Sequence, residues 1–338
     1  MAIDLGSRTT KAVSLQRHGE GFSLVNFAVQ DAPVFEKTFS ADVLADHLRN
    51  ISQVLNAKTK QVSVAISVTD ALLRHTELPL VPVADMRAML KFNAKMYLQQ
   101  DLPDYVFDCF ALPPARKGSL AESSKGTQKC RVLVGGTKSS YIADLHTAIK
   151  TAGLIPDTIT PGMVGTANAF ELAQPDVFAK EAVALVDIGF RNSSITILLN
   201  GELILSRVVG IGGDKITSGL AEAMSISYAE AEGIKIGMPA EVQAVLQAQL
   251  LPLGRELRAS IDFFEHQQDK TVSQVFLSGA SARSDFVVQT LQSELMIPCK
   301  TWNPAAFLAL VLSPEKTAEL EQVAPQLNVA VGTAAAEF

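Results

Sequence analysis

Apolar and polar positions along the chain alternate between helix-like and strand-like stretches. Apolar residues recur at helical spacing over residues 41–55, and they alternate with polar residues as in a strand over residues 61–68. Strands and helices that follow one another in this way are typical of an α/β protein. We therefore predict an α/β fold.

One internal repeat divides the chain into two parts. Asp4-Leu5-Gly6 opens residues 3–15, and Asp187-Ile188-Gly189 opens the matching residues 186–198. In both copies a short polar stretch and an extended apolar run follow the glycine, and after a turn comes another strand-like run, the pattern of a β-hairpin meander. Solenoid repeats recur every 20–50 residues or so, far closer than these copies, so we predict two homologous domains that each open with a hairpin.

Between the copies the pattern changes. Strand-like stretches at residues 72–78, 105–112 and 131–135 and helix-like stretches at residues 84–100 and 139–152 predict a small α/β module inserted into the first domain. The polar residues 113–129 are predicted to be a surface loop. After the second copy we expect helices at residues 215–224, 228–236 and 239–267, a strand at residues 274–278 and a closing apolar segment at residues 329–336.

Composition limits the classes of function. The chain has 338 residues, of which 48% are hydrophobic and 19% charged, enough to bury the cores of about two domains. Its net charge of −6, without a concentrated basic stretch, argues against a nucleic-acid binder. No uncharged apolar run approaches the ~20 residues of a spanning helix, so direct membrane insertion is not expected. Three widely spaced cysteines without metal-ligand spacing favour a reducing compartment.

The chemical prediction rests on the two Asp-x-Gly elbows. A glycine in a tight turn lets backbone N–H groups approach an anion, and Asp4 and Asp187 suit a Mg²⁺ that neutralises a polyphosphate. One elbow alone is better explained by an ordinary hairpin, but its duplication favours a nucleotide tail held between Gly6 and Gly189. The polar residues that follow the two glycines are Ser7, Thr9, Thr10, Lys11, Asn192 and Ser193.

Three further segments fit the same site, each with a competing interpretation. Ser278-Gly279-Ala280 ends a strand with small residues that would let an adenine or ribose lie against backbone, or it forms only a tight turn. Gly212-Gly213 precedes a helix whose free N–H groups could meet a phosphate, or Asp214 simply caps that helix. Glu232 and Lys235 could reach a ribose, although an exposed ion pair is the favoured interpretation.

Together, and in this order, the motifs resemble the actin-like ATPase superfamily and, within it, the PilM family of type IV pilus assembly proteins, which are relatives of FtsA. The resemblance implies an actin-like ATPase fold, in which two duplicated domains enclose a nucleotide cleft. It assigns residues 1–69, 159–180 and 326–338 to the first domain, residues 70–158 to the inserted small domain and residues 181–325 to the second domain. Residues 4–11 and 187–194 would be the two phosphate loops, and residues 278–280 the adenosine loop.

The resemblance also implies a role. Such a protein is a cytoplasmic nucleotide-binding adaptor, peripheral to the inner membrane through its partners, that holds the cytoplasmic N-terminal tail of a PilN-like bitopic membrane protein near the small domain. Residues 334–338 do not form the amphipathic helix of FtsA, which favours the pilus interpretation. An FtsA-like division or type II secretion scaffold, a small-molecule kinase of the same fold and a scaffold without ligand remain alternatives, and self-association stays open.

Three departures from the family pattern concern catalysis. Residues 159–164 carry no acidic side chain where relatives position the attacking water, Phe190 and Arg191 enlarge the second phosphate loop, and the side chains of residues 278–281 would crowd a base. No catalytic residue is assigned. We expect nucleotide binding with slow hydrolysis, or a degenerate site with neither.

Overall fold

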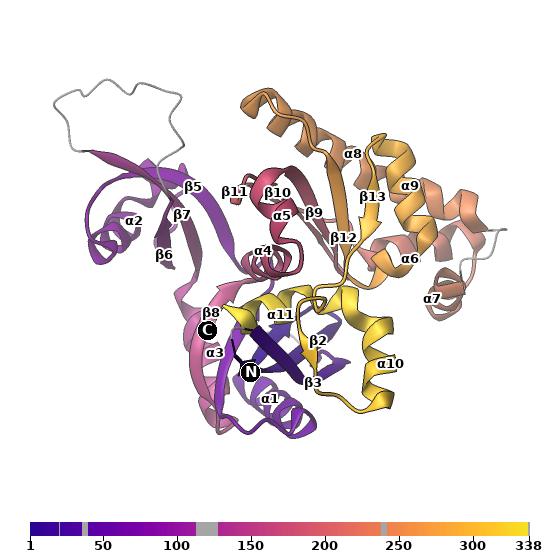
Figure 1. Cartoon of the computed structure of the whole chain (residues 1–338), viewed down its shortest axis with the longest axis horizontal. Coiled ribbons are helices and arrows are strands. Elements are labelled where there is room, and N and C mark those ends of the chain that lie inside the picture. The colour runs from indigo at the N-terminus through magenta and orange to yellow at the C-terminus, as the bar shows by residue number, and fades with distance from the viewer. Residues whose placement is uncertain (20, 36–39, 113–127, 238–241, 337–338) are drawn as a thin grey trace.

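A computed structural model describes residues 1–19, 21–35, 40–112, 128–237 and 242–336. Its strands form three sheets (Figure 1) of six, five and three strands. The surface loop predicted at residues 113–129 lies almost entirely outside the described residues. None of the helices in the described ranges is long and apolar enough to cross a membrane.

The six-stranded sheet has the order β14-β3-β2-β1-β4-β8. An antiparallel meander of β1, β2 and β3 forms its centre, and β4 and β8 extend it in parallel beside β1. The strands are β1 (Ala2–Leu5), β2 (Thr9–His18), β3 (Gly21–Asp31), β4 (Gln61–Ile66), β8 (Ile155–Pro161) and β14 (Ala309–Leu310). Helices α1 (Ala41–Leu55) and α3 (Ser139–Thr151) share one core with this sheet, in which Leu48 and Ile149 are fully buried.

The five-stranded sheet repeats this arrangement in the order β11-β10-β9-β12-β13. Its strands are β9 (Ala182–Ile188), β10 (Ser193–Leu199), β11 (Glu202–Val209), β12 (Gln274–Ser278) and β13 (Cys299–Thr301). Asp4 lies opposite Lys11 in the first hairpin, and Asp187 lies opposite Ser194 at the same spacing in the second. The predicted duplication is therefore confirmed, down to the register of the strands.

Helices on the second sheet follow the predicted pattern with small shifts at their ends. They are α6 (Gly213–Met224), α7 (Tyr228–Gly237), α8 (Gln243–Gln268), α9 (Asp285–Leu295) and the 3₁₀ turn η2 (Ala280–Arg283). Leu220 of α6 and Leu257 of α8 pack with Leu291 of α9 in the core of this domain.

Two helices lie between the large sheets (Figure 1): α4 (Gly162–Ala173) and α11 (Asn328–Ala335). Phe170 of α4 contacts Phe276 of β12 with 4.6 Å between ring centroids. Val331 of α11 belongs to the same core, which also contains Val13 of β2. The two domains therefore share one hydrophobic core through these helices. The remaining short helices are α5 (Pro175–Lys180), α10 (Pro314–Val323) and the 3₁₀ turn η3 (Ala324–Gln326).

The crossing of α4 and α11 depends on glycines. A Cβ added at Gly332 would overlap the carbonyl oxygen of Gly165, and one added at Gly165 would lie 2.7 Å from the carbonyl oxygen of Val329. Gly332→Ala should therefore reduce the free energy of unfolding by about 1–3 kcal/mol, measured with denaturant, because the helices must separate. Gly233→Ala is the matched control, since no described atom outside its own helix turn lies within 4 Å of its added Cβ. Equal stability of the two variants would contradict the prediction.

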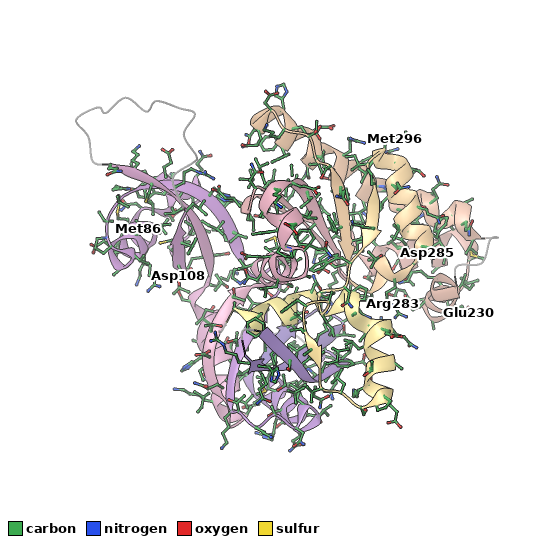
Figure 2. The ribbon with its side chains drawn as sticks, viewed as in Figure 1. Met86, Asp108, Glu230, Arg283, Asp285 and Met296 are labelled. Atoms are coloured by element: carbon green, nitrogen blue, oxygen red, sulfur yellow. The ribbon has the colours of Figure 1, made fainter. Side chains whose placement is uncertain are left out.

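The three-stranded sheet forms a small unit with its own core. It consists of β5 (Leu72–Pro79), β6 (Tyr105–Ala111) and β7 (Lys129–Lys138) in the order β5-β7-β6, and α2 (Val83–Leu98) covers one face. Met86 and Leu90 of α2 pack against Val132 and Val134 of β7. In Figure 2 Met86 and Asp108 mark this unit at the side of the molecule.

The expected domain limits need two corrections. The insertion is shorter than residues 70–158, because α3 packs against α1 and β8 pairs with β4, so both belong to the first domain. The second domain ends before residue 325, because β14 pairs with β3 and Lys316 of α10 donates a hydrogen bond to the Phe27 carbonyl oxygen. Both segments therefore pack on the first sheet.

A half-buried histidine, His75, lies where the small unit meets the second domain. Burial, and secondarily the Arg131 charge, lowers the pKa of His75, although a backbone hydrogen bond with Leu203 and the Glu202 carboxylate oppose the shift. Its Nε2 atom is buried without a hydrogen-bond partner among the described residues. The ring is therefore neutral at neutral pH in the folded protein.

This histidine predicts a loss of stability in mild acid. Between the unfolded pKa of 6.5 and the lower folded pKa, the unfolded chain binds a proton at His75 that the folded protein does not bind. The free energy of unfolding therefore falls as the pH falls between these two pKa values. In His75→Gln the melting temperature should decline less steeply from pH 6.5 to about pH 5 than in the parent protein. Parallel declines would show that His75 does not contribute.

Candidate functional site

The two predicted elbows have the same backbone geometry. A Cβ added at Gly6 would overlap the carbonyl oxygen of Thr9, and one added at Gly189 would lie 2.6 Å from the carbonyl oxygen of Asn192. Both turns are therefore too tight for any residue except glycine. Because glycine itself has no side chain, a ligand can approach the backbone of both turns closely, and at Gly6 the Lys11 ammonium lies beside this approach.

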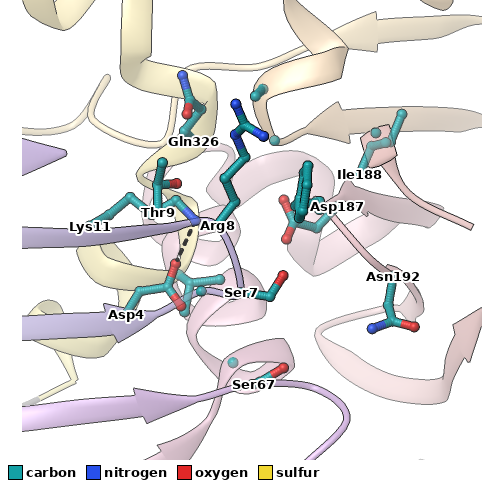
Figure 3. Close-up of a pocket in the computed structure, with 18 of the residues that line it drawn as sticks. Asp4, Ser7, Arg8, Thr9, Lys11, Ser67, Asp187, Ile188, Asn192 and Gln326 are labelled. Carbon is teal, nitrogen blue, oxygen red and sulfur yellow. Dashed lines mark ion pairs between the residues drawn. The ribbon is translucent and has the colours of Figure 1, made fainter. Parts of the chain in front are cut away.

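Both elbows line a single cleft between the two domains (Figure 3). Its volume is about 200 Å³. The first domain contributes the β1–β2 elbow and the end of β4, the second contributes the β9–β10 elbow, α7 and η2, and α11 closes the remaining side. The predicted site residues that line this cleft are Asp4, Gly6, Ser7, Thr9, Lys11, Asp187, Gly189, Asn192, Gly213, Glu232, Lys235, Gly279 and Ala280.

Four predicted residues lie outside the lining and support it from behind. Thr10 Oγ1 is 2.8 Å from His47 Nε2, and Ser193 donates a 2.6 Å hydrogen bond to the Ile211 carbonyl oxygen. Alternation along a strand turns these side chains away from the cleft that their neighbours line. Ser278 donates to Asp187 Oδ1 at 3.0 Å, and Gly212 is the N-cap residue of α6.

The two aspartates differ in their surroundings. Asp4 forms an ion pair with Lys11, with 3.3 Å between Oδ2 and Nζ, drawn as the dashed line in Figure 3. Asp187 is half-buried at the cleft, and its burial raises its pKa, although the Lys11 charge and hydrogen bonds from Ser278 and Asn328 oppose the shift. A nearby cation would therefore strongly favour its ionised form.

A metal at this site would need ligands beyond the protein. Within the described ranges no group of three or more His, Cys, Asp or Glu side chains could hold a metal ion. Asp4 and Asp187 line the same cleft, and two carboxylates are the usual protein contribution to a Mg²⁺ that takes its other ligands from water and phosphate. The pair therefore suits Mg²⁺ with a polyphosphate.

The pair of Glu232 and Lys235 corrects a prediction. The two charged atoms are 2.8 Å apart, and the side chains are only 23% and 10% exposed, so the expected exposed ion pair is wrong. The Thr217 hydroxyl of α6 accepts a 2.6 Å hydrogen bond from Lys235 and donates one of 2.6 Å to Glu232. Although burial alone would raise it, these hydrogen bonds lower the pKa of Glu232. The pair is thus a fixed polar wall of the cleft.

Sequence reasoning missed several residues of the lining. Ser67 follows β4, which occupies the same place in the first sheet as β12 in the second. Because β12 ends at the predicted Ser278-Gly279, the repeat could have indicated that Ser67 also lines the cleft. Asn328 donates to Thr166 Oγ1 and Ser278 Oγ at 2.9 and 3.1 Å, and nothing local in the sequence indicates this role. Arg8 and Phe190 also line the cleft. From α4 the described lining includes Gly162 alone.

Two duplicated α/β domains that face each other across a cleft, each with an Asp-x-Gly elbow, define the actin-like ATPase fold. The family model described as "Type IV pilus assembly protein PilM" matches residues 2–338. The chain therefore belongs to the PilM family.

Solved structures show the same fold. The "PilM-PilN type IV pilus biogenesis complex" is similar with a TM-score of 0.84 and 22% identity, over 99% of this chain and 97% of that one. The ethanolamine utilization protein EutJ from Carboxydothermus hydrogenoformans has a TM-score of 0.55 and 14% identity, over 98% and 88% of the two chains. MreB5 of Spiroplasma citri, bound to ADP, has a TM-score of 0.53 and 10% identity, over 99% and 94%.

Proposed function

We propose that this chain is a cytoplasmic nucleotide-binding adaptor of a type IV pilus assembly machine. It binds ATP with Mg²⁺ in the cleft and holds the cytoplasmic N-terminal tail of a PilN-like bitopic inner-membrane protein beside the small unit. The observation that carries the nucleotide part is that both glycine elbows and both aspartates line one cleft between the domains. Membership of the PilM family supports the pilus part.

Each wall of the cleft has a part in holding the nucleotide. Backbone N–H groups of the elbows, with the Ser7 and Asn192 side chains, donate to the phosphates. Asp4 and Asp187 hold Mg²⁺, which neutralises phosphate charge when bound. The wall of Glu232 and Lys235 takes the ribose hydroxyls. The adenine lies against the backbone at Gly279 and Ala280, where the lining side chains are small.

Hydrolysis is slow at most. Among the described residues, α4 offers only Gly162 to the cleft, and glycine has no side chain to orient an attacking water. The lining carboxylates of Asp4 and Glu232 are paired with lysines, and the Asp187 carboxylate accepts a hydrogen bond from Ser278. The nucleotide therefore serves mainly as a ligand that joins the two domains, and its hydrolysis is not the main source of free energy.

The tail binds in a second cavity of about 620 Å³, which lies between the small unit and both large domains. One wall is the face of the three-stranded sheet opposite α2, with Leu73, Leu133 and Phe110. The other wall is formed by α4 and the β10–β11 hairpin, with Ala167 and Leu203. We call this cavity the groove. Its apolar walls suit the apolar side chains of an extended peptide.

Charge at the groove favours a basic tail. The acidic side chains in its lining are Asp108, Glu171 and Glu202, and its described lining holds no lysine or arginine. Arg87 and Arg131 pair with Asp108 and Glu202, whereas Glu171 has no ion pair among the described residues. A tail that combines apolar residues with a lysine or arginine would complement these groups.

Two measurements on the full chain test the proposal. Mg²⁺ATP at about 100 times its dissociation constant should add about 2.7 kcal/mol to the free energy of unfolding, seen as a thermal shift. A synthetic peptide copying the cytoplasmic tail of the PilN-like protein should bind in isothermal titration calorimetry, and a scrambled peptide should not. Absence of the thermal shift would overturn the nucleotide role, and absence of peptide binding the adaptor role.

A further inference from the structure

Among the described residues, three cations line the nucleotide cleft: Arg8, Lys11 and Lys235. Lys11 pairs with Asp4 and Lys235 with Glu232, so both lysine charges are already matched by carboxylates. Arg8 forms no ion pair with any residue that the structure describes. Its guanidinium carbon lies instead over the Phe190 ring, 4.9 Å from the centroid.

The contact of Arg8 with Phe190 joins the two domains. Arg8 belongs to the first elbow and Phe190 to the second, and Figure 3 shows the Arg8 side chain extending between the Lys11 side of the cleft and Asp187. Both residues also line an outer cavity of about 870 Å³, which reaches Asp31 and Tyr141. The contact therefore stands between the nucleotide cleft and this outer cavity.

A terminal phosphate competes well with the aromatic ring for this guanidinium. Arginine matches phosphate oxygens with two parallel charge-assisted hydrogen bonds, which are stronger than a partly exposed cation–π contact. The cleft of about 200 Å³ is also smaller than the roughly 300–1,000 Å³ of typical ligand sites. Movement of Arg8 away from Phe190 would open the cleft toward the outer cavity.

We propose that Arg8 is the residue that distinguishes a nucleoside triphosphate from a diphosphate, by exchanging its interdomain contact with Phe190 for the terminal phosphate. The inference rests on the proposed nucleotide site and adds to it a residue outside the Asp-x-Gly motif. It also connects the number of phosphates to the contact between the domains. The triphosphate form lacks the Arg8 and Phe190 contact, and the diphosphate form keeps it.

Calorimetric titration with Mg²⁺ATP and Mg²⁺ADP tests this role on the full chain. Arg8→Gln should lower the affinity for ATP about tenfold or more and the affinity for ADP little, because a charge-assisted hydrogen bond is lost only in the triphosphate complex. Phe190→Leu should raise the affinity for ATP, because the guanidinium no longer has to leave the ring. Arg17→Gln is the matched control, since it removes the same charge from an exposed position of β2 and lies outside the lining of both the cleft and the outer cavity.

The outcomes separate this inference from the nucleotide site itself. Equal losses for ATP and ADP in Arg8→Gln, or the same loss in Arg17→Gln, would overturn the role of Arg8 and leave the site intact. Lower ATP affinity in Phe190→Leu, with an unchanged melting temperature, would overturn the exchange. Failure of the parent protein to bind either nucleotide would overturn the proposed function and this inference with it.

Discussion

Asp187→Asn should abolish the stabilisation of the protein by Mg²⁺ATP. The substitution keeps the size of the side chain and an oxygen that accepts the Ser278 hydrogen bond, but it removes the charge that the metal needs. The expected loss is the whole thermal shift, about 2.7 kcal/mol at 100 times the dissociation constant. Asp262→Asn, on the exposed side of α8, is the control and should keep the shift.

The same variant should melt at a higher temperature than the parent when EDTA removes metal at neutral pH. Burial raises the pKa of Asp187 in the folded protein above its unfolded pKa of 3.8. The parent protein therefore loses stability as the pH rises from 3.8 through the folded pKa, whereas the asparagine variant does not titrate and keeps its stability. Differential scanning fluorimetry measures both effects. A variant that kept its Mg²⁺-dependent shift would exclude Asp187 as a ligand.

Gly135→Phe should block the tail from the groove. Gly135 lies on β7 in the groove lining, and its added Cβ would meet only Pro161 at an ordinary 3.6 Å, so the ring can enter the cavity without moving the backbone. We expect the affinity for the tail peptide to fall at least thirtyfold, about 2 kcal/mol, as for the central contact of an interface. Calorimetry with the peptide measures the loss.

Phe92→Ala is the control for the groove. Phe92 is 78% exposed on α2, which covers the opposite face of the small sheet, so tail binding should not change. Deletion of residues 70–158 would be a poor substitute, because it removes α3 and part of β8 from the core of the first domain. Unchanged peptide affinity in Gly135→Phe would place the tail elsewhere.

The elements and the elbows were predictable because their signals are local. Asp-x-Gly and the apolar runs that follow it need only a dozen neighbouring residues, and their recurrence at Asp187 indicated the duplication. The limits of the insertion were not predictable in this way. Leu145 and Ile149 of α3 show that one helix face is buried, but not that α1 covers it.

The site details that were missed depend on contacts between distant segments. Lys235 is buried and Glu232 is half-buried, with Thr217 of α6 against both, and their spacing alone cannot show this. Arg8 meets Phe190 only when the two domains come together. Sequence patterns therefore predicted which residues surround the cleft better than how those residues are held.

Helix α4 contributes to both the nucleotide cleft and the groove. Its first residue, Gly162, lines the nucleotide cleft, while Val164, Ala167 and Asn168 on its next turns line the groove. If α4 moves when a ligand binds in one of these cavities, the lining of the other cavity therefore moves as well. Thermodynamic linkage makes such an effect mutual. If ATP changes the affinity for the tail of the PilN-like protein by some factor, the tail changes the affinity for ATP by the same factor.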